Sequence, residues 1–408
     1  MTDIVQRKTW RTPLMVVLCA CVISLLSFGP RSAVGQFLTP MSIEHGWGRD
    51  VFSVALAVQN LLWGVGQPFA GAIADRFGTI RVLWFGAIVY ALGLFWMAQA
   101  DTPNALTLSA GVLIGFGLSG CSFTLVIGAL GKLVPESWRG FSFGAGTAAG
   151  SFGQFLFSPL ARFLIDQFGW QTALVVFAAA LLLILPLSLM LASPRTEAKG
   201  AAAAPQSVTQ ALAEAFGHRS YVLLVLGFFT CGFQLAFITV HLPSYLIDRG
   251  LSAQIGAWTV GVIGLFNIFG SIFSGWLGNR IPKRFILSVI YFSRALAVIA
   301  FILLPASPAT AITFGAVTGL LWLSTVPPTS GLVALMFGTR WLSMLFGFAF
   351  FSHQVGGFLG VWLGGFVFER TGSYDAVWWL SVLFGVLSAL INLPIVEKPV
   401  IRVVPVAA

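Results

Sequence analysis

The feature that most constrains this chain is a series of long apolar runs separated by short polar or charged turns. A helix needs about 20 mostly apolar residues to cross the hydrocarbon core of a bilayer. Strands of an outer-membrane barrel would instead be shorter runs of alternating polarity. The sequence therefore predicts an all-α membrane protein with twelve transmembrane helices. The predicted segments are residues 14–38, 51–74, 81–99, 105–130, 140–165, 170–193, 221–247, 255–278, 285–304, 309–337, 341–368 and 375–396.

Charge follows the same pattern. Of the 408 residues, 58% are hydrophobic and only 9% charged, against about a quarter charged in soluble domains. The N-terminal tail and every second turn carry most of the 22 basic residues, whereas the opposite turns and helix ends hold Arg49, Arg162, Arg249 and Arg370. Basic residues gather on the cytoplasmic side of a membrane. We therefore expect a multi-pass inner (plasma) membrane protein with both termini cytoplasmic. Its net charge of +9 then reflects topology and requires no nucleic acid partner.

The chain reads as two related halves. The one long polar interruption, residues 194–220, leaves six predicted segments on each side, so we predict an N-terminal half (1–193), a cytoplasmic linker (194–220) and a C-terminal half (221–408). Two repeated six-helix halves imply a substrate site near the midplane between them. Several residues recur at an offset of 203: Gly144 with Gly347, Gly153 with Gly356, Asp166 with Glu369, and Gly169 with Gly372.

A charged turn also recurs, at an offset of 204. Residues 71–81 read G-x-x-x-D-R-x-G-x-x-R, and residues 275–284 repeat the turn with asparagine in place of aspartate. The turn and its recurrence resemble the loop signature of the major facilitator superfamily of secondary transporters. The resemblance implies a role in gating at the cytoplasmic helix ends. The predicted gating residues are Gly71, Asp75, Arg76, Gly78, Arg81, Asn279 and Arg280.

Ionisable residues deep in the predicted helices point to the class of ligand. All 13 acidic residues lie near predicted helix ends, in turns or in tails. The deep candidates are instead Arg31, Arg294, His241 and His353, and intramembrane ionisable residues are functional hypotheses by default. A buried positive charge without a negative one favours an anion. The alternative for Arg31 is that it extends to the lipid headgroups or pairs with Glu44.

The surroundings of Arg31 narrow the resemblance. Pro30-Arg31-Ser32 before Gly35 and Phe37 resembles a Pro-Lys-Ser motif of monocarboxylate transporters, with arginine in place of the substrate-linked lysine. The glycine- and alanine-rich run from Gly144 to Gly153, followed by Phe168-Gly169-Trp170, is similar to their second motif and to related oxalate:formate-type carboxylate transporters. The sequence departs from that family in the 255–278 segment, where Asn267 and Ser271 stand at the positions of a charged pair.

Other polar residues complete the predicted site. Gln234 and His241 share one face of the 221–247 segment, and His353-Gln354 lies in the middle of the 341–368 segment; each could equally be a structural hydrogen-bonding residue. His353 is the candidate for proton coupling, because histidine titrates near physiological pH. For Arg294 we favour a structural role. The predicted substrate-binding residues are Arg31, Gln234, His241, Asn267, His353 and Gln354.

These features lead to one hypothesis and two alternatives. We expect a secondary transporter of small organic anions, monocarboxylates above all, working by alternating access as a monomer in membrane lipid and coupled to protons. One alternative is an efflux transporter of amphipathic molecules, which the lack of a deep acid argues against. The other is a membrane sensor that does not transport. The sequence holds no metal-ligand cluster or nucleophile constellation typical of an enzyme, and no cofactor is predicted.

Overall fold

The computed structural model describes residues 12–122, 125–126, 129–130, 133–192, 208–338 and 342–400. Within these ranges the chain is helical and contains no strand. Ten described helices or pairs of helices are long and apolar enough to cross a membrane, and α3 and α8 extend beside them with 29 and 33 residues. The bounds are α1 (Pro13–Ser32), α2 (Gly35–His45), α3 (Arg49–Phe77), α4 (Thr79–Met97), α5 (Pro103–Leu106), η1 (Thr107–Leu113), α6 (Ile114–Cys121), α8 (Glu136–Phe168), α9 (Trp170–Leu182), α10 (Ile184–Ser188), η2 (Leu189–Leu191), α11 (Val208–Gly217), α12 (Arg219–Asp248), α13 (Ala253–Leu277), α14 (Lys283–Leu303), α15 (Pro308–Leu321), α16 (Val326–Phe337), α17 (Leu342–Thr371) and α18 (Asp375–Asn392).

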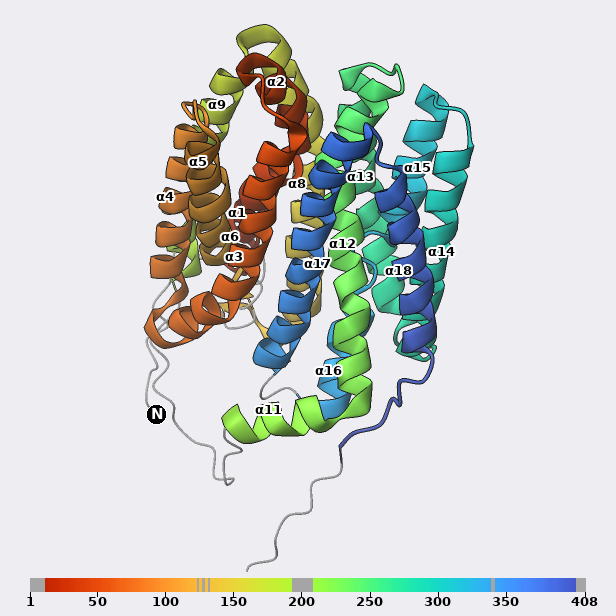
Figure 1. Ribbon diagram of the computed structural model, residues 1–408. Coiled ribbons are helices and arrows are strands. Elements are labelled where there is room, and N and C mark those ends of the chain that lie inside the picture. Colours follow the sequence, from red (N-terminus) through yellow and green to blue (C-terminus); the bar gives the residue numbers. More distant parts are fainter. Residues whose placement is uncertain are drawn as a thin grey trace, which may run out of the picture.

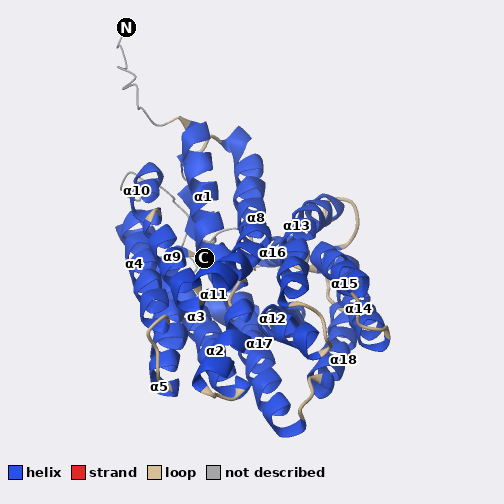
Figure 2. Cartoon of the chain, turned by 90° about the horizontal axis from the view of Figure 1, so that it is seen from above, coloured by secondary structure: helices blue, strands red, loops and turns tan. Residues whose placement is uncertain are grey.

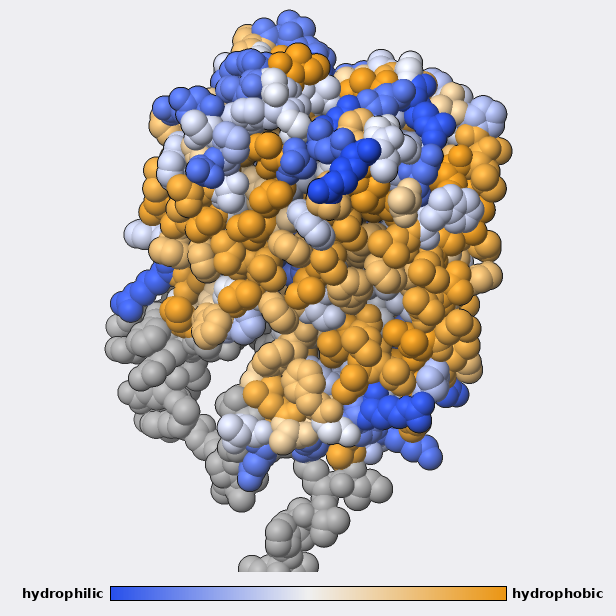
Figure 3. Space-filling model, viewed as in Figure 1, coloured by the Kyte–Doolittle hydropathy of each residue, from blue (hydrophilic) through white to orange (hydrophobic). Residues whose placement is uncertain are grey.

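The helices stand side by side in two bundles (Figure 1), one built from α1 to α10 and the other from α12 to α18. Each bundle has its own large cluster of buried apolar side chains. Helix α11 lies across one end, which we call the linker end; the turns before Arg49 and after Asp248 mark the opposite, distal end. The surface between the two ends is a broad apolar belt (Figure 3), as expected where lipid surrounds a protein.

Four of the predicted segments are interrupted rather than continuous, and one of them, the sixth, is broken at Leu183 between α9 and α10. The first breaks after Ser32, two residues beyond Pro30, and resumes as α2. The fourth contains a π-helical stretch, η1. The tenth is unwound between Leu321 and Val326, just before Pro327 and Pro328. Proline lacks an N–H group and restricts the residue before it, which accounts for the unwound stretch before Pro327 and Pro328 but not for η1 or for the break that follows Pro30.

Equivalent positions of the two halves adopt the same conformation. Gly169, between α8 and α9, and Gly372, between α17 and α18, both have positive φ angles, of 84° and 68°. In each half a helix also packs closely at the paired glycine: a Cβ atom on Gly153 would meet the backbone of α1, and one on Gly356 would meet that of α12. These contacts lie within a half, which is the ordinary packing of small residues in membrane helices.

Two helix pairs form the main seams between the halves. Helix α3 packs on α17 and α8 packs on α13, with α2 beside α12 at the distal end (Figure 2). Small residues allow the approach: Gly264 of α13 faces the backbone of α8 at Ser151, and Gly64 of α3 faces the side chain of Gln354. The candidate polar residues therefore lie at or near the α3–α17 and α8–α13 seams, where the helix backbones approach each other closely.

Candidate functional site

Arg31 lies in the last turn of α1, where the helix ends and the chain turns into α2. Its side chain is only 5% exposed, and its Nη2 donates a hydrogen bond to Oδ1 of Asn60 on α3 at 2.8 Å. Asn60 is held by its own bond from Nδ2 to the carbonyl of Leu56 at 3.0 Å. The Nε of Arg31 has no hydrogen-bond partner. The guanidinium thus keeps a donor that is not satisfied by the protein.

No described acid neutralises Arg31. None of the ion pairs between described residues includes it, and no described aspartate or glutamate is buried. Glu44, the partner that the sequence offered as an alternative, accepts instead from Trp170 and Gln171. An unpaired buried charge is costly, and Arg31 is a buried cation without a described counter-ion.

Gln354 places a residue of the C-terminal half beside Arg31 and Asn60. It lies on α17 and is 1% exposed, and its Nε2 has no hydrogen-bond partner. Both the Oε1 of Gln354 and the Cγ of Asn60 lie within 3.5 Å of the place that a Cβ on Gly357 would take. Arg31, Asn60 and Gln354 therefore form a polar cluster across the α3–α17 seam; we call it the central cluster.

Gln234 and His241 form hydrogen bonds within the protein, although Nδ1 of His241 has no hydrogen-bond partner. Gln234 donates to the carbonyl of Ser381 at 3.0 Å and accepts from Arg294. His241 bonds the carbonyl of Val361 through Nε2 at 2.9 Å, joining α12 to α17. Both residues are buried inside the C-terminal half, and neither shares a contact with the central cluster. Their geometry fits the structural alternative stated above.

Asn267 connects three elements. Its Nδ2 donates to Oγ of Ser151 on α8 at 3.0 Å, and its Oδ1 accepts from the backbone N–H of Leu323 at 2.9 Å. Ser271 donates to the same oxygen at 3.0 Å. Asn267 thus ties the α8–α13 seam to the unwound stretch between α15 and α16.

Arg294 supports the same unwound stretch from the other side. Its Nε donates to the carbonyl of Leu321 at 3.1 Å, and its Nη2 donates to the carbonyl of Trp322. A break in a membrane helix leaves carbonyl groups that only other protein groups can satisfy. Arg294 does so here, which is the structural role expected for it.

His353 points away from Gln354, its neighbour in sequence. Its ring stacks on Phe350 at 5.5 Å between centroids and lies 5.1 Å from Phe228, beside the thiol of Cys231. Its Nδ1 has no hydrogen-bond partner. His353 therefore lies next to the central cluster but is not a member of it.

The predicted gating residues lie at the linker end. Gly78 has a φ of 96° and forms the turn between α3 and α4; Arg81 is exposed, and Asn279 and Arg280 are exposed after α13. The side chains of Asp75 and Arg76 are outside the described residues. At Gly71 no described atom lies within 4 Å of a Cβ position, and the same is true of Gly347 on α17.

At the distal end the α3–α17 seam is closed by a charged cluster that sequence analysis assigned only to turns. Arg49 of α3 donates to both oxygens of Asp248 on α12, at 2.6 and 2.7 Å, and to the hydroxyl of Tyr374 at 3.0 Å. Its backbone N–H donates to Glu369 of α17. We call these four residues the distal lock. The sequence feature that could have indicated this cluster is an arginine at the start of one helix together with acidic residues at the distal ends of α12 and α17.

Tyr374 enters the distal lock as a neutral group. Burial raises the pKa of its hydroxyl to about 12, although the nearby Arg49 guanidinium lowers it. The hydroxyl therefore stays protonated at physiological pH, and the charge of Arg49 is balanced by Asp248 and Glu369. These bonds cross from one half to the other.

Comparison with known proteins agrees with this architecture. The family model of the Major Facilitator Superfamily matches residues 20–361. The chain belongs to the major facilitator superfamily. It is a twelve-helix transporter and not an enzyme. An uncharacterised transporter of this superfamily, YcxA of Bacillus subtilis, is 26% identical, with 96% of this chain and 98% of the relative aligned. Monocarboxylate transporter 13 of Rattus norvegicus is 27% identical over 89% of this chain and 84% of its own.

Solved structures share the fold. A D-xylose-proton symporter superposes with a TM-score of 0.73 at 17% identity, covering 94% of this chain and 98% of its own. A bacterial homologue of the lysosomal transporter Spinster, in an inward-facing conformation, gives 0.75 at 15% identity, covering 94% and 97%. At these identities the likeness concerns the fold alone.

Proposed function

We propose that this transporter moves small organic anions, monocarboxylates above all, across the inner membrane by alternating access. The observation that carries the proposal is Arg31, a buried guanidinium at a helix break with no described acid beside it and an unused donor. Guanidinium and carboxylate match in a planar, two-bond geometry. The name of the relative from Rattus norvegicus supports the same substrate class.

The central cluster also supplies a link between binding and movement. Arg31 and Asn60 belong to one half and Gln354 to the other. An anion that accepts from both Arg31 and Gln354 would draw the two halves together around it. Such a ligand has a different affinity for each conformation, and this is the condition for a ligand to shift a conformational equilibrium.

The two ends of the α3–α17 seam support alternating access. The distal lock joins the halves at one end, whereas no described atom packs closely on Gly71 or Gly347 near the other. With the linker end in the cytoplasm, as the charge distribution predicts, this conformation is closed to the outside. Breaking the distal lock and closing the linker end would give the opposite conformation.

An efflux transporter of amphipathic molecules would require different residues at the site. A transporter of amphipathic cations would gain from a buried carboxylate, and no described aspartate or glutamate is buried. The central cluster offers hydrogen-bond donors and one positive charge instead. The organic anion is therefore the better match to the residues present.

Uptake into proteoliposomes tests the proposal. We expect labelled lactate or pyruvate to accumulate when the outside is more acidic than the lumen, whereas entry of tetraphenylphosphonium, a membrane-permeant amphipathic cation, should equal that into protein-free liposomes. His353→Gln should flatten the dependence of uptake on pH and leave exchange of internal for external anion intact, because exchange moves no net proton. Transport of the cation without the anions would replace this proposal by the efflux alternative. An unchanged pH dependence in the variant would remove His353 from coupling.

A further inference from the structure

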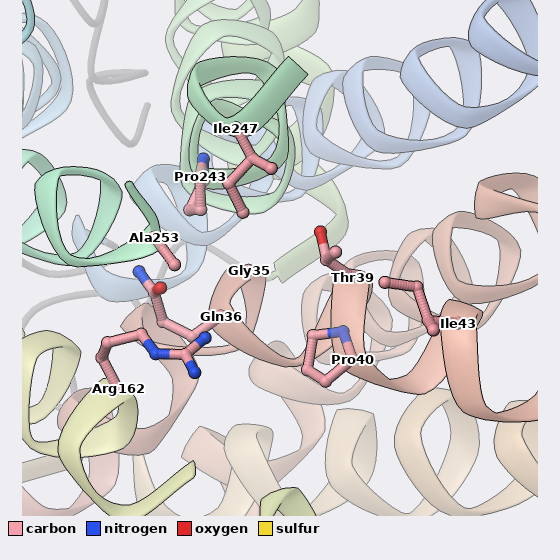
Figure 4. Close-up of a pocket in the computed structure, with 9 residues that line it drawn as sticks. All are labelled: Gly35, Gln36, Thr39, Pro40, Ile43, Arg162, Pro243, Ile247 and Ala253. Carbon is pink, nitrogen blue, oxygen red and sulfur yellow. The ribbon is translucent and has the colours of Figure 1, made fainter. Parts of the chain in front are cut away.

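A pocket of about 250 Å³ opens on the distal side of the α8–α13 seam (Figure 4); we call this the second seam and the α3–α17 seam the first. It lies between α2 and α8 of one half and α12 and α13 of the other. This volume is just below the roughly 300 to 1,000 Å³ typical of ligand pockets. The lining residues are Gly35, Gln36, Thr39, Pro40, Ile43, Arg162, Pro243, Ile247 and Ala253.

The internal repeat explains why the space is there. Under the offset of 204, Arg49 at the start of α3 corresponds to Ala253 at the start of α13. At the first seam the long side chain of Arg49 crosses to the other half and fills the distal end. At the second seam a methyl group takes its place, and the distal end of that seam is left partly empty.

The positive charge at the second seam comes from the opposite helix. Under the offset of 203, Arg162 of α8 corresponds to Gly365 of α17, which packs against Ser53 and the backbone of Arg49. In Figure 4 the guanidinium of Arg162 lies beside Gln36 and faces the pocket. The first seam therefore has an arginine that bridges the two halves, whereas the second seam has an arginine that lines a cavity.

Arg162 is the charged group in this pocket. It forms an ion pair with Asp166, one turn further along α8, but the side chain of Asp166 is 47% exposed and is not among the lining residues. The polar neighbours are already engaged: Gln36 donates to Ser158 at 3.2 Å, and Thr39 shares a hydrogen bond with Ser244 at 2.9 Å. Nε and Nη2 of Arg162 both donate to the carboxylate of Asp166, so the guanidinium nitrogen left to the pocket is Nη1, with proline and isoleucine side chains on the other sides.

We propose that this pocket binds an oxyanion carried on a short apolar body, either the carboxylate of an amphipathic acid or the phosphate of a lipid. Nη1 of Arg162 donates a charge-assisted hydrogen bond to the oxyanion while the exposed Asp166 keeps the other two donors, and the apolar walls take the body. The pocket has walls from both halves, so it exists as one site only while the distal end of the second seam is closed. A ligand there stabilises that closed conformation, because it binds one state better than the other. The site is separate from the central cluster and does not depend on the substrate proposed for it.

Binding of octanoate to purified protein in detergent tests the site. The measurement uses the Arg31→Gln background, so that the central cluster does not contribute, and isothermal titration reports affinity. We expect octanoate to bind and 1-octanol, its uncharged analogue, to bind at least about tenfold more weakly. Arg162→Gln and Ala253→Phe, which remove the charge and fill the space from opposite halves, should each weaken octanoate by about tenfold or more. Arg249→Gln, which alters another ion pair at the distal end, is the matched control and should bind like its parent.

Thermal melting confirms that each variant is folded. If folded Arg162→Gln and Ala253→Phe proteins both bind octanoate as tightly as the parent, the pocket is not the site and the proposal is wrong. Arg49→Ala, which releases the first seam, should also weaken octanoate; unchanged affinity there overturns the dependence on the closed conformation. A soluble short-chain phosphatidylglycerol separates the two sources: if it displaces octanoate, lipid phosphate is an occupant, and if it does not, the site is one for free carboxylates.

Discussion

At the scale of single residues, two buried arginines have opposite surroundings. Arg294 has its guanidinium engaged by carbonyls of the unwound stretch after α15 and by Gln234. Arg31 has one side-chain partner, Asn60, and a free Nε. A satisfied arginine supports the fold, whereas an arginine with an unused donor is available to a ligand. The sequence favours these different roles for the two arginines, but the hydrogen bonds that distinguish them are seen only once the helices are packed.

Arg294→Leu should destabilise the protein. The substitution leaves the carbonyls of Leu321 and Trp322 without their donor in an apolar setting, at about 1 to 3 kcal/mol for each unsatisfied group. We expect the free energy of unfolding to fall by about 2 to 4 kcal/mol in total, measured by denaturant titration in mixed micelles. Arg249→Leu, at an exposed ion pair of 3.7 Å, is the control and should cost less than about 1 kcal/mol. Equal effects of the two variants would show that Arg294 has no special structural role.

At the scale of helices, the sequence predicts which membrane helices exist and in what order they follow, but not where they are interrupted. Length and hydropathy located the spans because a membrane helix must be long and apolar. The break after Ser32 and the unwound stretch between α15 and α16 were missed, although prolines stand next to both. Proline is tolerated inside membrane helices when neighbours satisfy the freed groups, and those neighbours, Arg294 and Asn267, are known only once the helices are packed.

The same limit applies to the predicted site. Arg31 and Gln354 are brought to one seam, but Gln234, Asn267 and the Nε2 of His241 form hydrogen bonds with the protein itself. A residue's position along a helix indicates its face only roughly, and packing decides whether that face meets another helix or a cavity. The distal lock was missed for a related reason: its charges lie at helix ends far apart in the sequence, where they look like ordinary turn residues.

The distal lock should hold the α3–α17 seam closed. Arg49→Ala removes the bonds to Asp248 and Tyr374 while leaving the helices intact. Spin labels at Asn104, an exposed residue of α5, and at Ala306, an exposed residue between α14 and α15, would report the separation of the distal ends by pulsed electron paramagnetic resonance. We expect a population with longer distances in Arg49→Ala, and none in the control Arg249→Gln. Identical distance distributions in parent and Arg49→Ala protein would show that the lock does not set the conformation.

At the scale of the whole molecule, two similar halves have diverged where they meet. The glycine turns at Gly169 and Gly372 and the close packing at Gly153 and Gly356 are shared. The distal ends of the seams are not: one is filled by Arg49 and the other contains the pocket beside Ala253. The central cluster is also asymmetric, with its cation in the N-terminal half and Gln354 in the C-terminal half. Because the halves have diverged in this way, a molecule built from two similar halves has a single polar centre.

The most direct test of the account is the affinity of purified protein for a monocarboxylate before and after removal of the Arg31 charge. Isothermal titration with pyruvate should show binding to the parent, weaker binding to Arg31→Lys, which keeps the charge but loses the planar pair of donors, and a loss of about 2 to 5 kcal/mol in Arg31→Gln, the scale for truncating one partner of a buried charge pair. Thermal melting must show that both variants are folded. A folded Arg31→Gln protein that binds pyruvate as tightly as the parent would contradict the account.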